Sequence, residues 1–215
     1  MSGGKPLIPR ERLFALLDGA VAAAGRPPPV TLVQAPTGAG KSALLATWCA
    51  RRVGNPDTPG VVRVSLQSWH GHPAALYDAV CEALGPSDIG LVPRPRRSSV
   101  AVPPVCLVLD NAHELTGRPA AYLVAMLARQ APLRLVLAGR SAPLRPWLRA
   151  RGRLREIRAE DLAFTPAEAV ELLRAHGVPL RTGDVDELLH RTRGFAAALR
   201  LAVTSVNDRG GPPHR

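Results

Sequence analysis

Residues 30–45 constrain the fold of this 215-residue chain more than any other segment. A short apolar run (VTLVQ) leads into the loop APTGAGKS, and the residues after the loop have helical spacing. In this strand–loop–helix context the loop has the Walker A pattern, GxxxxGK[ST], with Ala35 in place of its first glycine. The segment therefore predicts an α/β fold that carries a phosphate-binding loop.

The residue types of this loop suit a bound phosphate. Gly38 and Gly40 allow backbone N–H groups to turn around an anion, and the following helix directs its partial positive charge to the same place. Lys41 is expected to reach the β- and γ-phosphates, and the Ser42 hydroxyl to bind Mg²⁺. The alternative is an unrelated glycine turn before a Lys-Ser pair, but the chain has only one other lysine, Lys5. We therefore expect ATP or ADP with Mg²⁺ to bind at the loop, which consists of Ala35, Pro36, Thr37, Gly38, Ala39, Gly40, Lys41 and Ser42.

Two later apolar runs end in charged residues. Residues 105–110 (VCLVLD) are typical of a Walker B strand, in which Asp110 would hold Mg²⁺ together with Ser42. Alone the pattern is weak, because strands often end in Asp. Its position strengthens the prediction, because one strand–helix unit separates it from the phosphate-binding loop. Residues 133–140 (LRLVLAGR) end in Arg140, whose guanidinium could contact the γ-phosphate. The alternative for Arg140 is one more surface arginine.

Apolar runs alternate with segments of helical period, which indicates a parallel sheet with helices on both faces. We expect strands at residues 30–34, 61–66, 105–109, 133–138 and 154–158. We expect helices at residues 10–24, 41–52, 73–84, 119–130, 166–177, 184–193 and 195–206. The proline-rich segment 86–104 is interpreted as a mobile surface loop. The chain would then divide into an α/β nucleotide-binding domain (1–158), a small helical lid (159–206) and a disordered tail (207–215).

Composition excludes several classes of protein. With 46% hydrophobic residues the chain is neither disordered nor collagen-like, and no apolar run reaches the length of a membrane span. The first residues lack the apolar core of a signal peptide, so we expect a cytoplasmic protein that binds no membrane. Cys49, Cys81 and Cys106 form no metal or redox pattern and are expected to be free thiols.

The formal net charge is +11, and all but two of the 28 Lys and Arg residues are arginine. Residues 140–158 hold seven of these arginines and a single acid, Glu156. Such a stretch permits binding to nucleic acid or another polyanion. The favoured alternative is a solvated arginine-rich surface, because no recognition motif accompanies the charges and Trp147 is the only aromatic residue among them.

With these motifs identified, the sequence resembles the STAND class of P-loop ATPases, and most closely the nucleotide-binding domain of large MalT-like, LuxR-type transcriptional regulators. The resemblance extends over nearly the whole chain and includes the start and end of the small helical subdomain, which a generic P-loop protein would not share. The segments that carry it are residues 7–13, 35–42, 107–113, 138–141, 162–169 and 194–202.

The resemblance implies a five-stranded parallel sheet of the ASCE/STAND type, with one strand between the Walker A and Walker B strands. It also implies a switch in which ADP holds a closed form, and ATP with an inducer opens it for self-association, reset by slow hydrolysis. Lys41, Ser42 and Asp110 would carry nucleotide and Mg²⁺, Arg140 would sense the γ-phosphate, and the segment near Arg10 would approach the base. DNA would be bound only through a further domain, outside these residues.

One departure from the family pattern concerns hydrolysis. The second acid of Walker B is Asn111 here, and an amide can orient water but cannot take its proton. Glu114 could substitute only if the chain bends towards the site, and His113 could contact phosphate or pack at the end of the strand. The leading hypothesis is therefore a nucleotide-binding switch with slow or impaired turnover. The alternatives are an active AAA or Orc-like ATPase that uses Glu114 and Arg140, a polyanion-binding module, and a remnant of a larger regulator.

Overall fold

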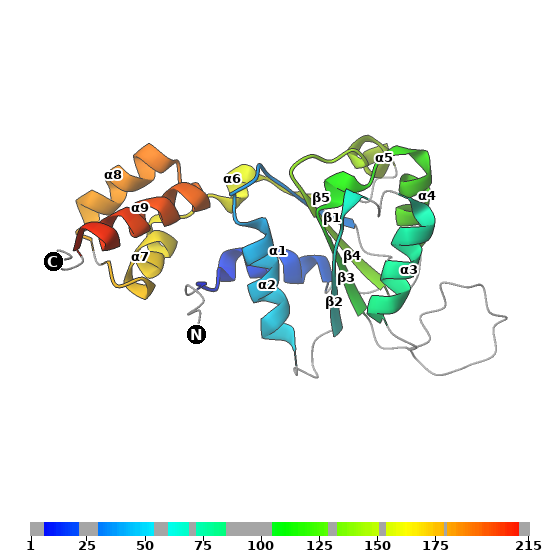
Figure 1. Ribbon diagram of the computed structural model, residues 1–215, viewed down its shortest axis with the longest axis horizontal. Helices are drawn as coiled ribbons and strands as arrows, with labels where there is room; N and C mark the ends of the chain where they lie inside the picture. The colour runs from blue at the N-terminus through cyan, green and yellow to red at the C-terminus, as the bar shows by residue number, and fades with distance from the viewer. Residues whose placement is uncertain are drawn as a thin grey trace.

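The computed structural model describes residues 7–21, 30–53, 60–68, 72–84, 105–128, 133–150, 154–178 and 180–210. Its centre is a five-stranded parallel sheet in the order β2-β3-β4-β1-β5 (Figure 1). The strands are β1 (Val30–Gln34), β2 (Gly60–Ser65), β3 (Val105–Asp110), β4 (Leu133–Gly139) and β5 (Leu154–Ile157). The predicted fold class is confirmed, and β4 separates the Walker A strand β1 from the Walker B strand β3 as expected.

The register of the strands brings the three predicted motifs to one edge of the sheet. Gln34, the last residue of β1, pairs with Gly139 at the end of β4. Asp110, the last residue of β3, pairs with Ala138 of the same strand. The phosphate-binding loop, the Walker B carboxylate and Arg140 therefore follow strands that end level with one another, at the carboxyl edge where α/β proteins bind ligands.

Helices cover both faces of the sheet (Figure 1). On one face, α1 (Glu11–Val21) and α2 (Lys41–Arg52) pack Phe14 and Trp48 against the sheet. On the other, α3 (Pro73–Leu84), α4 (Gly117–Leu127) and α5 (Arg145–Ala150) form a second core. Since both faces are covered, β3 is apolar along its length, and Leu107 and Val108 are fully buried.

Beyond the sheet, α6 (Ala159–Leu162) leads to a group of three helices that stands beside the α/β domain (Figure 1). These are α7 (Pro166–Ala175), α8 (Thr182–Thr192) and α9 (Ala196–Gly210). Thr165 and Glu168 form the predicted capping box at the start of α7. The helices enclose a separate small core of Ala169, Leu173, Val178, Val185 and Val203. We refer to residues 159–210 as the lid.

The elements differ from the sequence expectations mainly at their ends. Helix α9 continues to Gly210, so residues 207–210, which were expected to belong to the disordered tail, are helical. No helix breaker precedes Gly210, which explains the longer helix. The helices α5 and α6 and the short 3₁₀-helix η2 (Ala112–Glu114) were not predicted, because such short segments show no period. The expected loop at 86–104, residues 22–24 of the first helix and the tail from 211 lie outside the described residues.

Two further observations bear on the expectations. In the part of the chain that the structure describes, no helix is long and apolar enough to cross a membrane. Cys49, Cys81 and Cys106 are free thiols, and the same described residues contain no group of His, Cys, Asp and Glu side chains arranged to hold a metal ion.

Candidate nucleotide-binding site

The loop between β1 and α2 needs glycine at two positions. Gly38 has a φ of 87° and Gly40 a φ of 90°, in the left-handed region that side chains with a Cβ rarely adopt. Gly40 is also the N-cap of α2, so the loop ends where the helix begins. The backbone therefore curls at the N-terminus of α2, where free amide groups and the helix dipole favour an anion.

Lys41 folds back over this loop. Its ammonium donates hydrogen bonds to the carbonyl oxygens of Ala35 at 2.7 Å and Pro36 at 2.9 Å. Burial lowers the pKa of Lys41, and the nearby charge of Asp110 only partly opposes this effect. The first position of the Walker A pattern, Ala35, is buried and extends the pairing of β1 by donating its N–H to Gly139 at 3.2 Å. Alanine therefore fits this position without strain.

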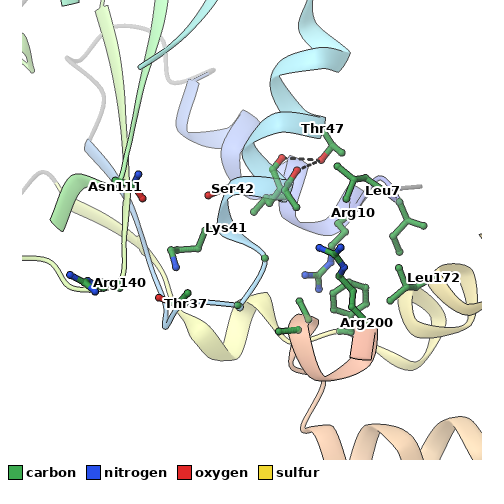
Figure 2. A pocket seen from close by; sticks show the side chains of 18 of the residues that line it. Leu7, Arg10, Thr37, Lys41, Ser42, Thr47, Asn111, Arg140, Leu172 and Arg200 are labelled. Atoms are coloured by element: carbon green, nitrogen blue, oxygen red, sulfur yellow. Dashed lines mark hydrogen bonds between the residues drawn. The ribbon is translucent and has the colours of Figure 1, made fainter. Parts of the chain in front are cut away.

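A pocket of about 340 Å³ opens between this loop and the lid (Figure 2). At one end lie Asn111 and Arg140 from the edge of the sheet, and at the other lie Leu7 and Leu172 together with Arg10 and Arg200. Four Arg and Lys side chains line the pocket: Arg10, Lys41, Arg140 and Arg200. Among the described residues that line it there is no carboxylate. The pocket therefore combines basic side chains with apolar ones, as a nucleotide requires.

The structure brings most of the predicted site residues together, but not all. The ones that line the pocket are Arg10, Thr37, Gly38, Gly40, Lys41, Ser42, Asn111 and Arg140. The predicted residues that do not line it are Ala35, Pro36, Ala39, Asp110 and Glu114. Ala35 and Ala39 pack in the core instead, which leaves the loop's backbone rather than these side chains facing the pocket.

Asp110 is nearly inaccessible, and both of its carboxylate oxygens have partners. Arg63 of β2 donates a hydrogen bond to Oδ2 at 2.6 Å, and the backbone N–H of Asn111 donates to Oδ1 at 2.9 Å. Mg²⁺ bound beside phosphates is usually held by one or two carboxylates. The side-chain oxygens among the described lining residues belong to hydroxyls and an amide (Thr37, Ser42, Thr47 and Asn111) and not to Asp110, so this arrangement does not fit the expected Ser42–Asp110 metal site.

The chain turns sharply after Asp110 and stays against the end of β4. Asn111 has a φ of 58°, and its side-chain amide donates to the carbonyl of Leu66 at 3.2 Å. His113 lines the pocket, with Nε2 lying 3.2 Å from Oε1 of Glu114. A Cβ at Gly139 would lie 2.9 Å from the backbone nitrogen of His113, so glycine is needed there for β4 to approach η2. Glu114 is thus paired with His113 outside the pocket.

Arg10 lines the pocket, but its guanidinium is engaged with the lid. It donates to the carbonyl oxygens of Leu162 and Ala163, each at 2.8 Å, and to Oε2 of Glu168 at 2.7 Å. The guanidinium carbon also lies 4.1 Å from the centre of the Phe164 ring. These contacts make Arg10 a link between the N-terminal segment and the lid. Its predicted place near a base stays a prediction.

The lid contributes residues that sequence reasoning missed. The backbone N–H of Ala197, in the first turn of α9, donates to the carbonyl of Gly38 at 3.0 Å. One turn later, Arg200 reaches the pocket, and no ion-pair partner for it occurs among the described residues. The spacing of three between Ala197 and Arg200 places both on one face of the helix. That spacing was the available signal, but it is informative only once α9 is known to dock on the loop.

The arginine-rich stretch 140–158 is partly neutralised within the fold. Glu156 of β5 lies 2.7 Å from Arg149 and 2.7 Å from Arg158, and Arg145 lies 3.9 Å away. The first of these arginines, Arg140, lines the pocket. Clustering of these arginines around one carboxylate weakens the interpretation of the stretch as a polyanion-binding surface.

Comparison with known proteins agrees with this geometry. The sequence model of the AAA domain family matches residues 26–148, which contain both Walker segments. The chain is 26% identical over 234 residues to the HTH-type transcriptional regulator MalT of Cronobacter sakazakii, covering 97% of this chain and 25% of that protein. The MalT of Yersinia enterocolitica is also 26% identical, over 91% of this chain and 23% of that protein. The chain thus spans about a quarter of the length of these curated relatives.

Solved structures with the same fold include Cdc6p of Pyrobaculum aerophilum, with a TM-score of 0.59 and 18% identity over 98% of this chain and 65% of that chain. The Orc1 protein of Aeropyrum pernix in complex with DNA gives a TM-score of 0.56 and 18% identity, over 97% of this chain and 63% of that chain. Identities at this level establish the fold alone. The match includes the lid as well as the sheet, because nearly the whole chain is covered.

Proposed function

Because this chain belongs to the AAA domain family, we propose that it is an ATP- or ADP-binding switch domain of a MalT-type regulator, with slow or impaired hydrolysis. The observation that carries the proposal is the pocket between the loop and the lid, which has four Arg and Lys side chains and, among its described lining residues, no acid. A nucleotide supplies the complementary groups, since it joins a polyanionic chain to an apolar base.

In this proposal the phosphates lie at the loop, where the N-terminus of α2, Lys41 and Arg140 offer positive charge. The ammonium of Lys41 exchanges the carbonyls of Ala35 and Pro36 for phosphate oxygens. The base lies towards Leu7 and Leu172, at the end away from Arg140, where Arg10 and Arg200 also lie. Mg²⁺ supplies further positive charge when it accompanies a nucleotide, but no step of the proposal depends on it.

The switch rests on the contact between the loop and the lid. Gly38 accepts a hydrogen bond from Ala197, and a Cβ at Gly38 would lie 2.9 Å from that of Ala197, so the two backbones touch. A ligand that rearranges the loop therefore changes the docking of α9. We propose that ATP, through Arg140, favours a different lid position from ADP, and that self-association in the ATP form follows. DNA binding would reside in a further domain of such a regulator.

We expect slow hydrolysis because, among the described residues, no carboxylate near the pocket is free to act as a general base. Asn111 faces the pocket with an amide, Asp110 is held by Arg63, and Glu114 pairs with His113 outside the lining. None of these groups accepts a proton from water in the pocket. The competing Orc-like ATPase would need Glu114 to enter the site. Rapid phosphate release that is lost in Glu114→Gln would favour the ATPase, and release at background would favour the switch.

Calorimetric titration with ADP tests nucleotide binding directly. We expect a dissociation constant on the order of 1 µM or below for the wild type. Lys41→Ala should abolish the heat of binding, whereas Arg191→Ala should not, because Arg191 is 76% exposed on α8 and only pairs with Glu187. Thermal melts of both variants would establish that they fold. Identical titrations of wild type and Lys41→Ala would refute the proposal.

A further inference from the structure

The Walker B carboxylate has a cationic partner on the neighbouring strand. Arg63 of β2 pairs in register with Val108 of β3, so Asp110 lies two residues further along the same face. Long side chains at such diagonal positions reach each other. Here the guanidinium Nη2 lies 2.6 Å from Oδ2 of Asp110. The topology of the sheet, rather than a nearby loop, therefore places this cation.

The carboxylate of the pair is shielded from water, whereas the arginine is partly exposed. The Asp110 side chain is 3% exposed and that of Arg63 is 31% exposed. A carboxylate at that depth is stable only with partners, and the N–H of Asn111 on Oδ1 completes its hydrogen bonding. For Asp110 to bind a metal, it would have to give up a charge-assisted hydrogen bond and leave Arg63 without its counterion.

The pocket compensates phosphate charge by other means. Lys41, Arg140 and Arg200 line it, and the described lining contains no carboxylate to attract a cation. Mg²⁺ dehydrates reluctantly and depends on carboxylates beside the phosphates. A nucleotide in this pocket therefore meets basic side chains, while the usual metal ligand is engaged elsewhere.

We propose that Arg63 is a positioning residue that withholds Asp110 from Mg²⁺, so that nucleotide binds here with little dependence on the metal. The inference rests on the proposed nucleotide-binding function. It gives Arg63, a residue outside both Walker patterns, control over the metal requirement of the site.

The test is the affinity for the fluorescent nucleotide mant-ADP, measured by titration in excess Mg²⁺ and again in EDTA. For the wild type, the two dissociation constants should agree within about threefold. In Arg63→Gln, Asp110 is released, and Mg²⁺ should tighten binding by about tenfold or more. Arg191→Gln, which removes an equal charge from an exposed position on α8, should behave like the wild type.

A second variant is needed because Arg63→Gln leaves a buried carboxylate without its ion pair and could therefore misfold. The double variant Arg63→Gln/Asp110→Asn removes that charge. It should bind mant-ADP with the same affinity in Mg²⁺ and in EDTA, as the wild type does. Strong Mg²⁺ dependence in the wild type, or weak dependence in Arg63→Gln whose melt shows it folded, would overturn the inference and leave the proposed function standing. Absence of mant-ADP binding under every condition would overturn both.

Discussion

Nη2 of Arg10 lies 2.7 Å from Oε2 of Glu168, although 158 positions separate the two residues. Their side chains are 6% and 12% exposed. The same guanidinium binds the carbonyls of Leu162 and Ala163, at the junction between the sheet and the lid. A single arginine therefore joins the segment before α1 to the start of the lid, next to the pocket.

Replacing this arginine should destabilise the protein strongly. Arg10→Ala removes the nearest cation from the largely buried carboxylate of Glu168 and leaves the carbonyl of Leu162 without its arginine donor, and we expect a loss of about 3 kcal/mol in the free energy of unfolding. Arg12→Ala is the matched control, because Arg12 is 41% exposed and lies 3.6 Å from the same carboxylate. Its loss should stay below about 1 kcal/mol. Urea unfolding measures both, and equal losses would show that Arg10 has no special role.

The same pair predicts how stability depends on pH. Burial raises the pKa of Glu168, but hydrogen bonds from Arg10 and from the N–H of Thr165, with the charges of Arg10 and Arg12, lower it below the ordinary value of 4.5. A folded-state pKa below the unfolded one stabilises the protein above about pH 4.5, and this stabilisation is lost as the pH falls through the folded value.

Glu168→Gln removes this titrating group while keeping the shape of the side chain. The free energy of unfolding should therefore differ most between the wild type and the variant near neutral pH, and the two should converge in acid. Urea unfolding across the pH range gives the difference curve directly. A difference that does not shrink below pH 4.5 would contradict the assigned pKa.

Much of the fold could be predicted because its signals are local. The bounds of β1, α2 and α3 agree with the expected residues 30–34, 41–52 and 73–84. Each of these elements has a strong pattern and clear punctuation at its ends: the Gly-rich loop between the first two and proline at the start of the third. The end of α9 and the short helices α5 and α6 were missed, since their limits depend on packing rather than on a pattern.

The residues of the candidate site also fall into those that a local pattern identifies and those that it does not. The loop residues and Arg140 were identified because a contiguous motif or a strand end places them. Arg63 and Arg200 were not, because one depends on the register of β2 against β3 and the other on the docking of α9. Asp110 was identified, but its pairing with Arg63 could not be read from a motif. Long-range contacts thus decide which motif residues face the pocket.

Arg140 should distinguish ATP from ADP. It is exposed at the end of β4, lines the pocket and has no ion-pair partner among the described residues, so its guanidinium is available to a terminal phosphate. In Arg140→Ala we expect affinity for ATP to fall about tenfold and affinity for ADP to fall about twofold or less. Competition with mant-ADP measures both. Arg149→Ala, which removes a cation paired with Glu156, is the control, and equal losses for both nucleotides would argue against γ-phosphate sensing.

The hydrogen bond between α9 and the loop can be removed by one substitution. Proline is tolerated in the first turn of a helix but has no N–H to donate. Ala197→Pro therefore deletes the bond to Gly38 while α9 is retained, and we expect a loss of about 1 kcal/mol in stability and faster hydrogen exchange in the loop.

Ala198→Pro is the matched control for this substitution. It places proline in the same turn but leaves the N–H of Ala197 in place, so the bond to Gly38 remains. The N–H of Leu199 still donates to the carbonyl of Phe195, so the first bond of the helix also remains. Exchange measured by mass spectrometry should rise for loop peptides in Ala197→Pro and stay close to wild type in Ala198→Pro. If the two variants exchange alike, the lid is held by side-chain packing alone, and the bond between the two backbones cannot couple the loop to α9.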